Sequence, residues 1–570
     1  MEADRILLLL SRVILILSSL GLLLRCVRSL LRDRSDPEIW AYLRSSKQSF
    51  PVTHWENLLG SSRSADLQLD GTGVRRFHAV LRRDDKGVWR LHDVFARGGV
   101  WVNGKAVGRD GLPVSNGDAI RLGGQSLRFQ DPAPEKRERL EAARSPAGRR
   151  VSPAVTLLEL TVFQIFLVLQ HVLSASPDYL SAILLSFSLL IILEWSLFNA
   201  MLVMERSGFE VETLAFYLTT LGFSVSASST PWDMYRQALF AALALIAFVL
   251  IGLWLRDLGR AARFRLPAAL AALALLGVNL LFGREINGAR NWLVLGGFSF
   301  QPSEFVKVAY IYVGAATLDT LYRRRNLFSF LAFSALCVCA LALLGDFGTA
   351  LVFFVTFLVI AFMRSGSIAT VFLALTGAGM AGMLAVSVKP HIARRFAAWG
   401  RVWADRYGAG YQQTRAMSAA AAGGLFGKGA GAGWLHEIRL NAASNTDLVF
   451  GLVCEELGLL IGVFMMCAVL ILAFSAVRSA RNGRSAYSAI ASCAAVAMLL
   501  TQMALNVFGS LDLLPFTGVT FPFVSKGGSS LLSSWMLLAF LKSADNRRGG
   551  SFAVRPGAKK LRPTAKEGRP

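Results

Sequence analysis

Basic residues gather in two segments that separate long apolar stretches of the chain. Segment 388–447 holds eight of them, and segment 283–302 adds Arg284 and Arg290. Guanidinium groups pair well with phosphate oxygens, which favours an outward-facing anion site on these segments. The alternative is a solvated charge cluster, because basic patches are often no more than that. Charge alone leaves both interpretations open.

A carboxylate and an ammonium group near the end of one apolar stretch extend this pattern. Glu304 and Lys307 are spaced i,i+3, so a helix places them on one face. Ionisable residues within membrane segments are functional candidates by default. The alternative for this pair is a structural ion pair.

The elements that must position these residues are membrane helices. The chain has 570 residues, 54% of them hydrophobic, and a mean hydropathy of +0.48. Spanning a bilayer takes about 20 mostly apolar residues, and many stretches qualify. After an apolar anchor at 6–24, we predict helices near 154–174, 178–204, 210–226, 237–255, 266–282, 303–322, 327–344, 347–363, 369–387, 448–475, 487–509 and 528–543.

The distribution of basic residues predicts the orientation of the chain. Arginines directly follow the anchor, and basic loops then alternate along the sequence, which favours a cytoplasmic position for residues 40–132 and for the basic tail 546–570. The same alternation places segment 388–447 outside the membrane, although it is basic. Long loops can depart in this way from the rule that basic loops are cytoplasmic. The net charge of +23 therefore does not indicate nucleic acid, and no nucleic-acid-binding motif is present.

Residues 40–132 differ from the rest of the chain. Short runs typical of strands alternate with glycine-containing turns, which predicts a small antiparallel β-sandwich. A charged stretch at 133–152 reads as a basic linker to the helices that follow.

The cysteines and histidines predict no metal site. Five of the six cysteines lie in apolar segments, and none forms a CxxC pair, so disulfides and zinc are not expected. The histidines form no HExxH motif. No resident cofactor is indicated, and a requirement for a divalent cation is left open.

Five motifs, in collinear order, resemble one family of membrane proteins. They are GREINGARNWLVLGGFSFQPSEFVKVAYI (283–311), GDFGTALVFF (345–354), RRFAAWGRVWADRYGAGYQQTRAMSAAAAGGLFGKGAGAG (394–433), NTDLVFGLVCEELGLLIG (445–462) and LLPFTGVTFPFVSKGGSSLL (513–532). The chain resembles the shape, elongation, division and sporulation (SEDS) family, which includes FtsW, RodA and SpoVE.

This resemblance implies a mainly α-helical, polytopic membrane fold. A ten-helix core would occupy residues 209–545, with the anchor at 1–35 and two helices at 153–208 as about three additions. The family is a group of peptidoglycan glycosyltransferases that polymerise lipid II outside the membrane and pair with a class B penicillin-binding protein, a transpeptidase.

The family's chemistry needs a base and a cationic site. The attacking sugar hydroxyl must lose a proton, and a carboxylate suits that role. The leaving group is a lipid pyrophosphate, whose growing charge needs cations. Inversion at the anomeric carbon fits a single displacement.

The resemblance also implies the site residues. Asp447 matches the family's essential aspartate and is the expected catalytic base, the alternative being a helix N-cap. The expected substrate-binding residues are Glu304, Lys307, Arg395, Arg290, Gln412 and Ser525. For Asp346, Glu455 and Glu456 we expect structural roles such as helix capping or internal pairing.

Some positions depart from the family pattern. Asn445 stands where relatives often have His, Lys526 where Tyr is usual, and Val402 replaces a Pro, while Leu440–Ala442 replace an LPE sequence. These changes bear on substrate preference and leave the proposed base in place.

The predicted sandwich resembles a forkhead-associated (FHA) domain. Such domains read phosphothreonine with an Arg, a Ser and an Asn, where this chain has Ser61, Arg75 and Gly98. We therefore expect a degenerate recognition domain with an unknown cytoplasmic ligand.

Two other functions compete with glycosyl transfer. A lipid II flippase would need a central charged cavity, whereas the polar motifs here fall in outer loops. A non-catalytic scaffold for cell-wall synthesis would be favoured by loss of the aspartate, which is present as Asp447.

Overall fold

The structure is a computed structural model of the full chain. It describes residues 2–32, 39–46, 48–62, 65–84, 87–94, 99–108, 111–133, 151–204, 206, 208–286, 289–295, 298–318, 324–365, 368–388, 390–438, 443–481 and 485–545.

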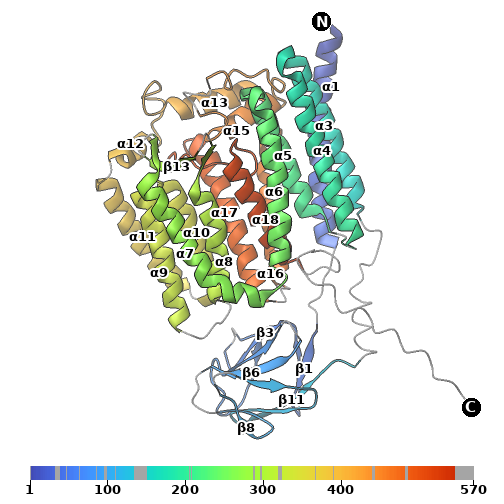
Figure 1. The fold of residues 1–570 in the computed structure, drawn as a ribbon, viewed down its shortest axis with the longest axis vertical. Coiled ribbons are helices and arrows are strands. Elements are labelled where there is room, and N and C mark those ends of the chain that lie inside the picture. The colour runs from blue at the N-terminus through green and yellow to red at the C-terminus, as the bar shows by residue number, and fades with distance from the viewer. Residues whose placement is uncertain are drawn as a thin grey trace, which may run out of the picture.

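A bundle of long, roughly parallel helices forms the larger part of the molecule (Figure 1). Three helices precede the part that carries the motifs: α1 (Glu2–Arg32), α3 (Pro153–Ser174) and α4 (Leu180–Val203). The others are α5 (Glu210–Ser229), α6 (Met234–Trp254), α7 (Leu258–Phe282), α8 (Pro302–Leu318), α9 (Arg324–Leu343), α10 (Phe347–Ser365), α11 (Ile368–Val388), α15 (Val449–Leu457), α16 (Leu459–Arg481), α17 (Ala486–Ser510) and α18 (Gly528–Ser543).

Seven of the described helices are long and apolar enough to cross a membrane: α1, α3, the span Pro177–Val203 that contains α4, the span Pro231–Trp254 that contains α6, α7, α16 and α17. Among the other helices, α5 is more polar, and neighbouring helices rather than lipid surround it. Helix α5 is buried along almost its whole length and carries Thr219, Thr220 and Ser224. Small and hydroxyl-bearing residues allow such close helix packing. The predicted multi-pass membrane fold is thus confirmed. The number of ten helices in the core remains a prediction.

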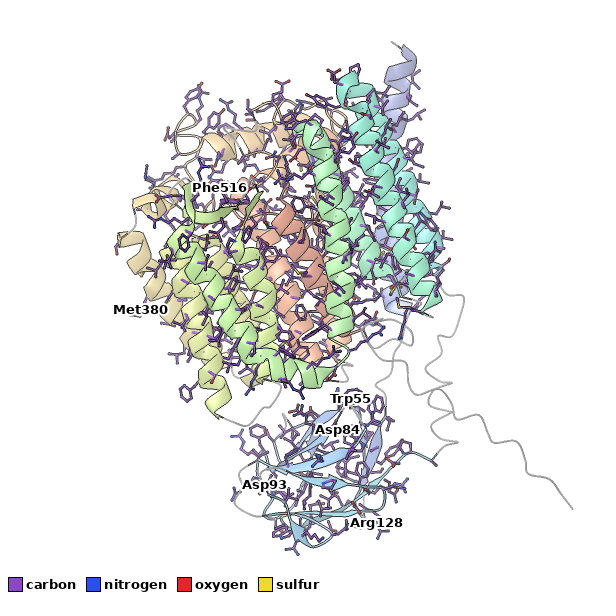
Figure 2. All side chains as sticks on the ribbon, in the orientation of Figure 1. Trp55, Asp84, Asp93, Arg128, Met380 and Phe516 are labelled. Carbon is purple, nitrogen blue, oxygen red and sulfur yellow. The ribbon has the colours of Figure 1, made fainter. Side chains whose placement is uncertain are left out.

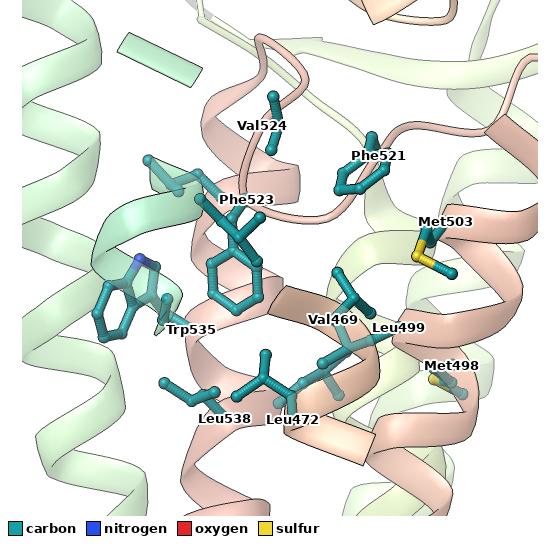
Figure 3. Close-up of a cluster of buried hydrophobic side chains, with 14 of the residues drawn as sticks. Val469, Leu472, Met498, Leu499, Met503, Phe521, Phe523, Val524, Trp535 and Leu538 are labelled. Atoms are coloured by element: carbon teal, nitrogen blue, oxygen red, sulfur yellow. The ribbon is translucent and has the colours of Figure 1, made fainter. Parts of the chain in front are cut away.

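Aromatic packing holds the centre of the bundle together (Figure 3). The fully buried indole of Trp535, on α18, lies between Phe216 of α5 and Phe248 of α6, with ring centroids 4.8 and 5.6 Å away. Phe523 contacts the same indole from the preceding loop, at 5.9 Å. This cluster fixes that loop over the end of the core.

Residues 41–130 fold into two packed sheets. The sheet orders are β2-β1-β11-β10-β7-β8 and β4-β3-β5-β6-β9. The strands are β1 (Ala41–Arg44), β2 (Ser49–Val52), β3 (Glu56–Gly60), β4 (Leu67–Gln68), β5 (Ala79–Arg83), β6 (Trp89–Asp93), β7 (Val100–Val102), β8 (Lys105–Ala106), β9 (Leu112–Val114), β10 (Ala119–Leu122) and β11 (Gln125–Gln130).

Alternating burial explains this sandwich, since strands such as β10 point every second residue inward. Side chains labelled in Figure 2, such as Trp55 and Arg128, come from its strands and loops. One pair departs from the predicted antiparallel pattern, because β3 and β4 run parallel.

The sandwich and the longest loops lie at opposite ends of the bundle. In Figure 1, α12 (Pro390–Ala398) and α13 (Tyr411–Gly423) cover one end, here called the loop end. The sandwich follows the last turn of α1 and precedes α3 at the other end, here called the sandwich end. Helices α1 and α3 run the full distance between the two.

Two loops contain structure that the sequence analysis did not predict. Helices α12 and α13 lie within segment 388–447. Segment 283–302 forms a three-stranded antiparallel sheet of β12 (Arg284–Ile286), β13 (Ala289–Leu295) and β14 (Phe298–Phe300). Both lie at the loop end, so Arg284, Arg290, Arg395 and Arg415 are carried by strands or helices.

The single helix predicted at 448–475 is wrong, since Gly458 divides it into α15 and α16. Gly458 has φ of 93°, which favours glycine. A Cβ atom there would lie 2.6 Å from the carbonyl carbon of Phe426. The break therefore lets the Gly-rich loop pass directly against the helix pair.

Substituting Gly458 should disrupt this crossing. We expect Gly458→Ala to lower the thermal unfolding midpoint of the detergent-solubilised protein, because the backbone is strained and a carbonyl collides with the new methyl group. Gly379→Ala, in α11, is the matched control, since nothing lies within 4 Å of its Cβ position. Equal midpoints for both variants would contradict this account.

Candidate functional site

Asp447 lies at the loop end, in a short segment just before α15. Its backbone carbonyl accepts hydrogen bonds from the Asn506 side chain, at 2.9 Å, and from the Ser510 hydroxyl, at 3.5 Å. The segment is also fixed from a second side, because the Ser525 hydroxyl donates to the Thr446 carbonyl at 2.5 Å. Polar residues of α17 and the loop before α18 thus position the carboxylate.

The carboxylate of Asp447 does not cap a helix. Helix α15 begins at Val449, its N-cap is Leu448, and no side chain caps it. The N-cap alternative for Asp447 is therefore wrong, and its side chain remains available for another role.

Glu304 and Lys307 form a buried ion pair in the first turns of α8. The Lys307 Nζ lies 2.7 Å from Glu304 Oε1, and both side chains are at most 3% exposed. The Ser533 hydroxyl donates to the other carboxylate oxygen of Glu304. This arrangement favours the structural alternative for the pair.

Asp346 joins the same end of the bundle between α9 and α10. Its Oδ1 accepts the Thr349 backbone N–H at 3.0 Å, so the predicted capping role is confirmed. Its Oδ2 accepts a hydrogen bond from Gln301 Nε2 at 3.4 Å. The carboxylate lies within electrostatic reach of Lys307 and Arg395.

Arg395 approaches the site from α12. Its Nη1 donates to the Thr517 carbonyl at 3.3 Å, and the residue is exposed. The next residue, Gly518, has φ of 68° and runs past Asp447, whose Oδ2 would lie 3.3 Å from a Cβ atom there. Segment 517–518 therefore connects the arginine to the aspartate.

The surroundings of Asp447 change its acidity. The pKa of this carboxyl is raised to about 7, chiefly by burial and to a smaller extent by the charge of Asp346. A hydrogen bond from Thr446 and the charge of Arg395 act in the opposite direction. A carboxylate with a pKa near neutrality is suited to accept a proton at physiological pH.

The other predicted substrate-binding residues are spread around this end. Ser525 is buried, and its hydroxyl is engaged with Thr446 and with the Phe521 N–H, which indicates a scaffolding role. Arg290 is exposed on β13 and pairs with Glu285 at 3.4 Å. Gln412 is half-buried in the first turn of α13.

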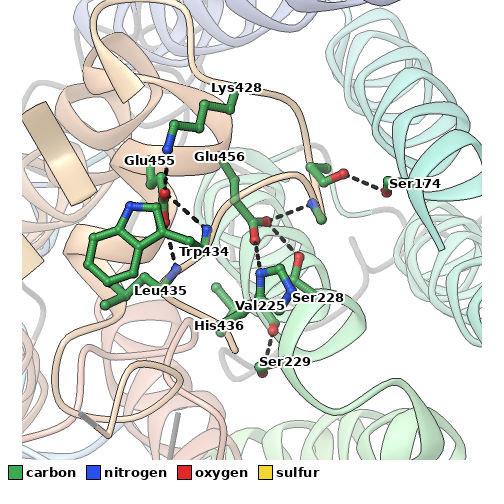
Figure 4. Close-up of polar contacts among 12 residues, drawn as sticks. Ser174, Val225, Ser228, Ser229, Lys428, Trp434, Leu435, His436, Glu455 and Glu456 are labelled. Carbon is green, nitrogen blue, oxygen red and sulfur yellow. Dashed lines mark hydrogen bonds and ion pairs between the residues drawn. The ribbon is translucent and has the colours of Figure 1, made fainter. Parts of the chain in front are cut away.

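Glu455 and Glu456, on α15, hold the Gly-rich loop in place (Figure 4). Glu455 pairs with Lys428 at 2.7 Å and accepts the backbone N–H groups of Trp434 and Leu435. Glu456 accepts the Ser228 hydroxyl at 2.6 Å. The predicted internal pairing of both glutamates is confirmed.

Among the described residues, no group of three or more His, Cys, Asp and Glu side chains could hold a metal ion.

Comparison with known proteins identifies the family. A profile of the FtsW/RodA/SpoVE family, described as cell cycle proteins, matches residues 213–549, more than half of the chain. The chain belongs to the FtsW/RodA/SpoVE family. A profile of the FHA domain matches residues 57–123.

Named members of the FtsW/RodA/SpoVE family are similar to this chain. Peptidoglycan glycosyltransferase RodA of Mycobacterium tuberculosis is 30% identical over 342 residues, covering 56% of this chain and 72% of RodA. Stage V sporulation protein E of Bacillus subtilis is 31% identical over 350 residues, covering 57% of this chain and 93% of that protein. As a member of this family, the chain is a glycosyltransferase of cell-wall synthesis.

One solved structure with this likeness is the crystal structure of Thermus thermophilus rod shape determining protein RodA. It is 26% identical, covers 60% of this chain and 97% of that chain, and has a TM-score of 0.45.

Sequence reasoning missed several residues that build the site. Gln301 and Thr517 lie inside the quoted motifs, yet their types alone do not mark them as partners of Asp346 and Arg395. Asn506 lies outside the motifs, and its only signal is an amide within an apolar helix.

Proposed function

We propose that this protein polymerises lipid II into glycan strands at the loop end, with Asp447 as the general base. The observation that carries this proposal is the uncapped carboxylate, whose pKa burial raises to about 7, beside a segment bound by Arg395. Polymerisation of lipid II by the purified full chain with its partner transpeptidase is the direct test.

The reaction is a single displacement with inversion. Asp447 accepts the proton of the acceptor sugar hydroxyl as the oxygen attacks the anomeric carbon of the donor. The new glycosidic bond forms as the bond to the lipid pyrophosphate breaks, and the leaving group departs with the electron pair.

Cations of the loop end receive the pyrophosphate in this proposal. Arg395 is exposed and close to Asp447, so its guanidinium is suited to a bidentate contact with phosphate oxygens. Lys307 is buried in its ion pair with Glu304, so in this proposal it does not contact the pyrophosphate. Its charge acts instead on the nearby carboxylate of Asp346. Arg290 lies on exposed β13 and would meet the substrate at the rim.

The pH profile tests the role of Asp447 as a base. We expect polymerisation to rise with pH around a midpoint near 7, because only the ionised carboxylate accepts a proton. The charge of Arg395 lowers the pKa of Asp447, so Arg395→Gln should shift this midpoint to higher pH. Arg406→Gln, a change in the same loop, should leave it in place. A profile without a transition in this range would argue against Asp447 as the base.

The proposed orientation places the loop end outside and the sandwich in the cytoplasm. We expect a membrane-impermeant thiol reagent to label Arg406→Cys, at the loop end, and not Lys105→Cys, on the sandwich, in intact cells. Both positions are exposed, so accessibility differs only by the side of the membrane. Labelling of the unsubstituted chain gives the background, and the reverse pattern would overturn the orientation and the proposed site.

The proposed partner is a class B penicillin-binding protein, which would cross-link the strands as they form. The sandwich would bind a cytoplasmic ligand by contacts other than those of ordinary phosphothreonine recognition, because Ser61 and Arg75 differ from the residues that such domains use. The third departure, Gly98, lies outside the described residues.

A further inference from the structure

The loop end of α3 is bound directly to the Gly-rich loop that follows α13. Gln170 Oε1 accepts the backbone N–H of Ala430 at 3.0 Å, and the Ser174 hydroxyl donates to the Ala430 carbonyl at 2.7 Å. Gln170 and Ala430 are each 1% exposed. A buried backbone group depends on its hydrogen-bond partner, so these two side chains determine where Ala430 can lie.

Residues of helix α1 stabilise the same contact between α3 and the loop. The Nε2 of Gln170 donates to the Ser11 hydroxyl at 2.9 Å, which fixes the orientation of the amide. The guanidinium of Arg12 donates to the Lys428 carbonyl. Two helices from outside the matched family region 213–549 therefore hold residues 428–430 of the loop.

The contact leaves no space between helix and loop. Gly431 has φ of 75°, and a Cβ atom there would lie 2.6 Å from the Ser174 hydroxyl oxygen. The left-handed backbone favours glycine here, and any larger residue would also have to displace the Ser174 hydroxyl.

The opposite side of the loop is attached to α15. The Lys428 N–H donates to the Glu455 carbonyl at 2.9 Å, and the Gly431 N–H donates to the Glu456 carboxylate at 3.0 Å (Figure 4). Helix α15 starts at Val449, two residues after Asp447. The loop is thus a direct connection between α3 and the helix that follows the proposed base.

We propose that α1 and α3 position the glycosyl-transfer site through this loop, with Gln170 and Ser174 as positioning residues for α15 and Asp447. The inference rests on the proposed function, because its catalytic part requires Asp447 to be the base. None of these side chains contacts the reacting atoms, so their effect is on the placement of the carboxylate.

The experiment uses the full chain with its partner transpeptidase and the double variant Gln170→Met/Ser174→Ala. Methionine keeps the length of glutamine and removes its hydrogen bonds. We expect amide exchange in residues 427–433 to become roughly tenfold faster or more. The rate at saturating lipid II should fall about 10-fold to 100-fold while KM changes little, because a misplaced base slows the chemical step.

Gln164→Met is the matched control on the same helix. Gln164 is also buried, but it donates to Glu194 and Thr220, away from the loop, at 2.9 and 3.0 Å. Its loss should leave both the exchange of 427–433 and the turnover at wild-type values. An equal loss of turnover in this control would show a general effect on the bundle and overturn the positioning role.

Other outcomes separate this inference from the proposed function. Faster exchange of the loop with an unchanged polymerisation rate would show that the contact is merely structural. Unchanged exchange would show that Gln170 and Ser174 do not hold the loop. A third outcome is that the unsubstituted complex makes no glycan while loop exchange still responds as expected. In that case the proposed function fails, and the catalytic positioning role of Gln170 and Ser174 is refuted with it. The contact between α3 and the loop would then be structural.

Discussion

Asp447→Asn should abolish most lipid II polymerisation while the protein still folds and inserts. A general base contributes typically 10²–10⁴-fold, and we expect a loss of about that size. Asparagine has nearly the same shape but does not accept the proton. Because Asp447 caps no helix and is held by its backbone carbonyl, the variant retains the contacts to Asn506 and Ser510. Turnover is measured with purified lipid II and the partner transpeptidase.

Asp512→Asn is the control for this substitution. Asp512 also lies at the loop end, where it accepts the Gly400 N–H at 3.0 Å, and its φ of 59° suits asparagine equally well. The Asp512→Asn variant should polymerise lipid II at the normal rate. Normal activity of Asp447→Asn would remove the catalytic assignment, and loss of the folded protein in this variant would show that Asp447 is structural.

Lys307→Met should be strongly destabilising. The substitution leaves Glu304 buried without its cation, and breaking a buried pair from one side costs about 3–5 kcal/mol. The double variant Glu304→Gln/Lys307→Met should recover much of this loss, because it removes both charges. The measurement is the thermal unfolding midpoint of the detergent-solubilised chain.

The exposed pair of Arg290 and Glu285 provides the comparison. Arg290→Met breaks an ion pair whose side chains are 52% and 57% exposed, and such pairs contribute about 0–1 kcal/mol. Its midpoint should stay close to that of the unsubstituted protein. If Lys307→Met unfolds normally but raises the KM for lipid II, Lys307 binds the pyrophosphate directly, as the sequence analysis predicted.

Apolar length and local patterning made the type of most elements predictable. The helix expected at 154–174 is α3 at Pro153–Ser174, and the helix expected at 528–543 is α18 with the same bounds. Both properties depend on residues close together in the sequence, and so does the alternation that predicted the sandwich. The break at Gly458 depends instead on the backbone of Leu425 and Phe426, which the fold brings against this helix from a distant part of the sequence. No local pattern contains that information.

The sequence by itself determined a membrane protein with an aspartate in a recognisable motif and basic residues in its loops. Only the tertiary structure decided what each charge does. In the structure Lys307 is buried against Glu304, and Arg395 is exposed beside segment 517–518. The side chain of Asp447 does not cap the helix that follows it. The reason is physical: the role of an ionisable group depends on its hydration and on partners brought by other helices, and residue type specifies neither. The same holds for Gln170, an inconspicuous amide in an apolar helix until folding places it against Ala430.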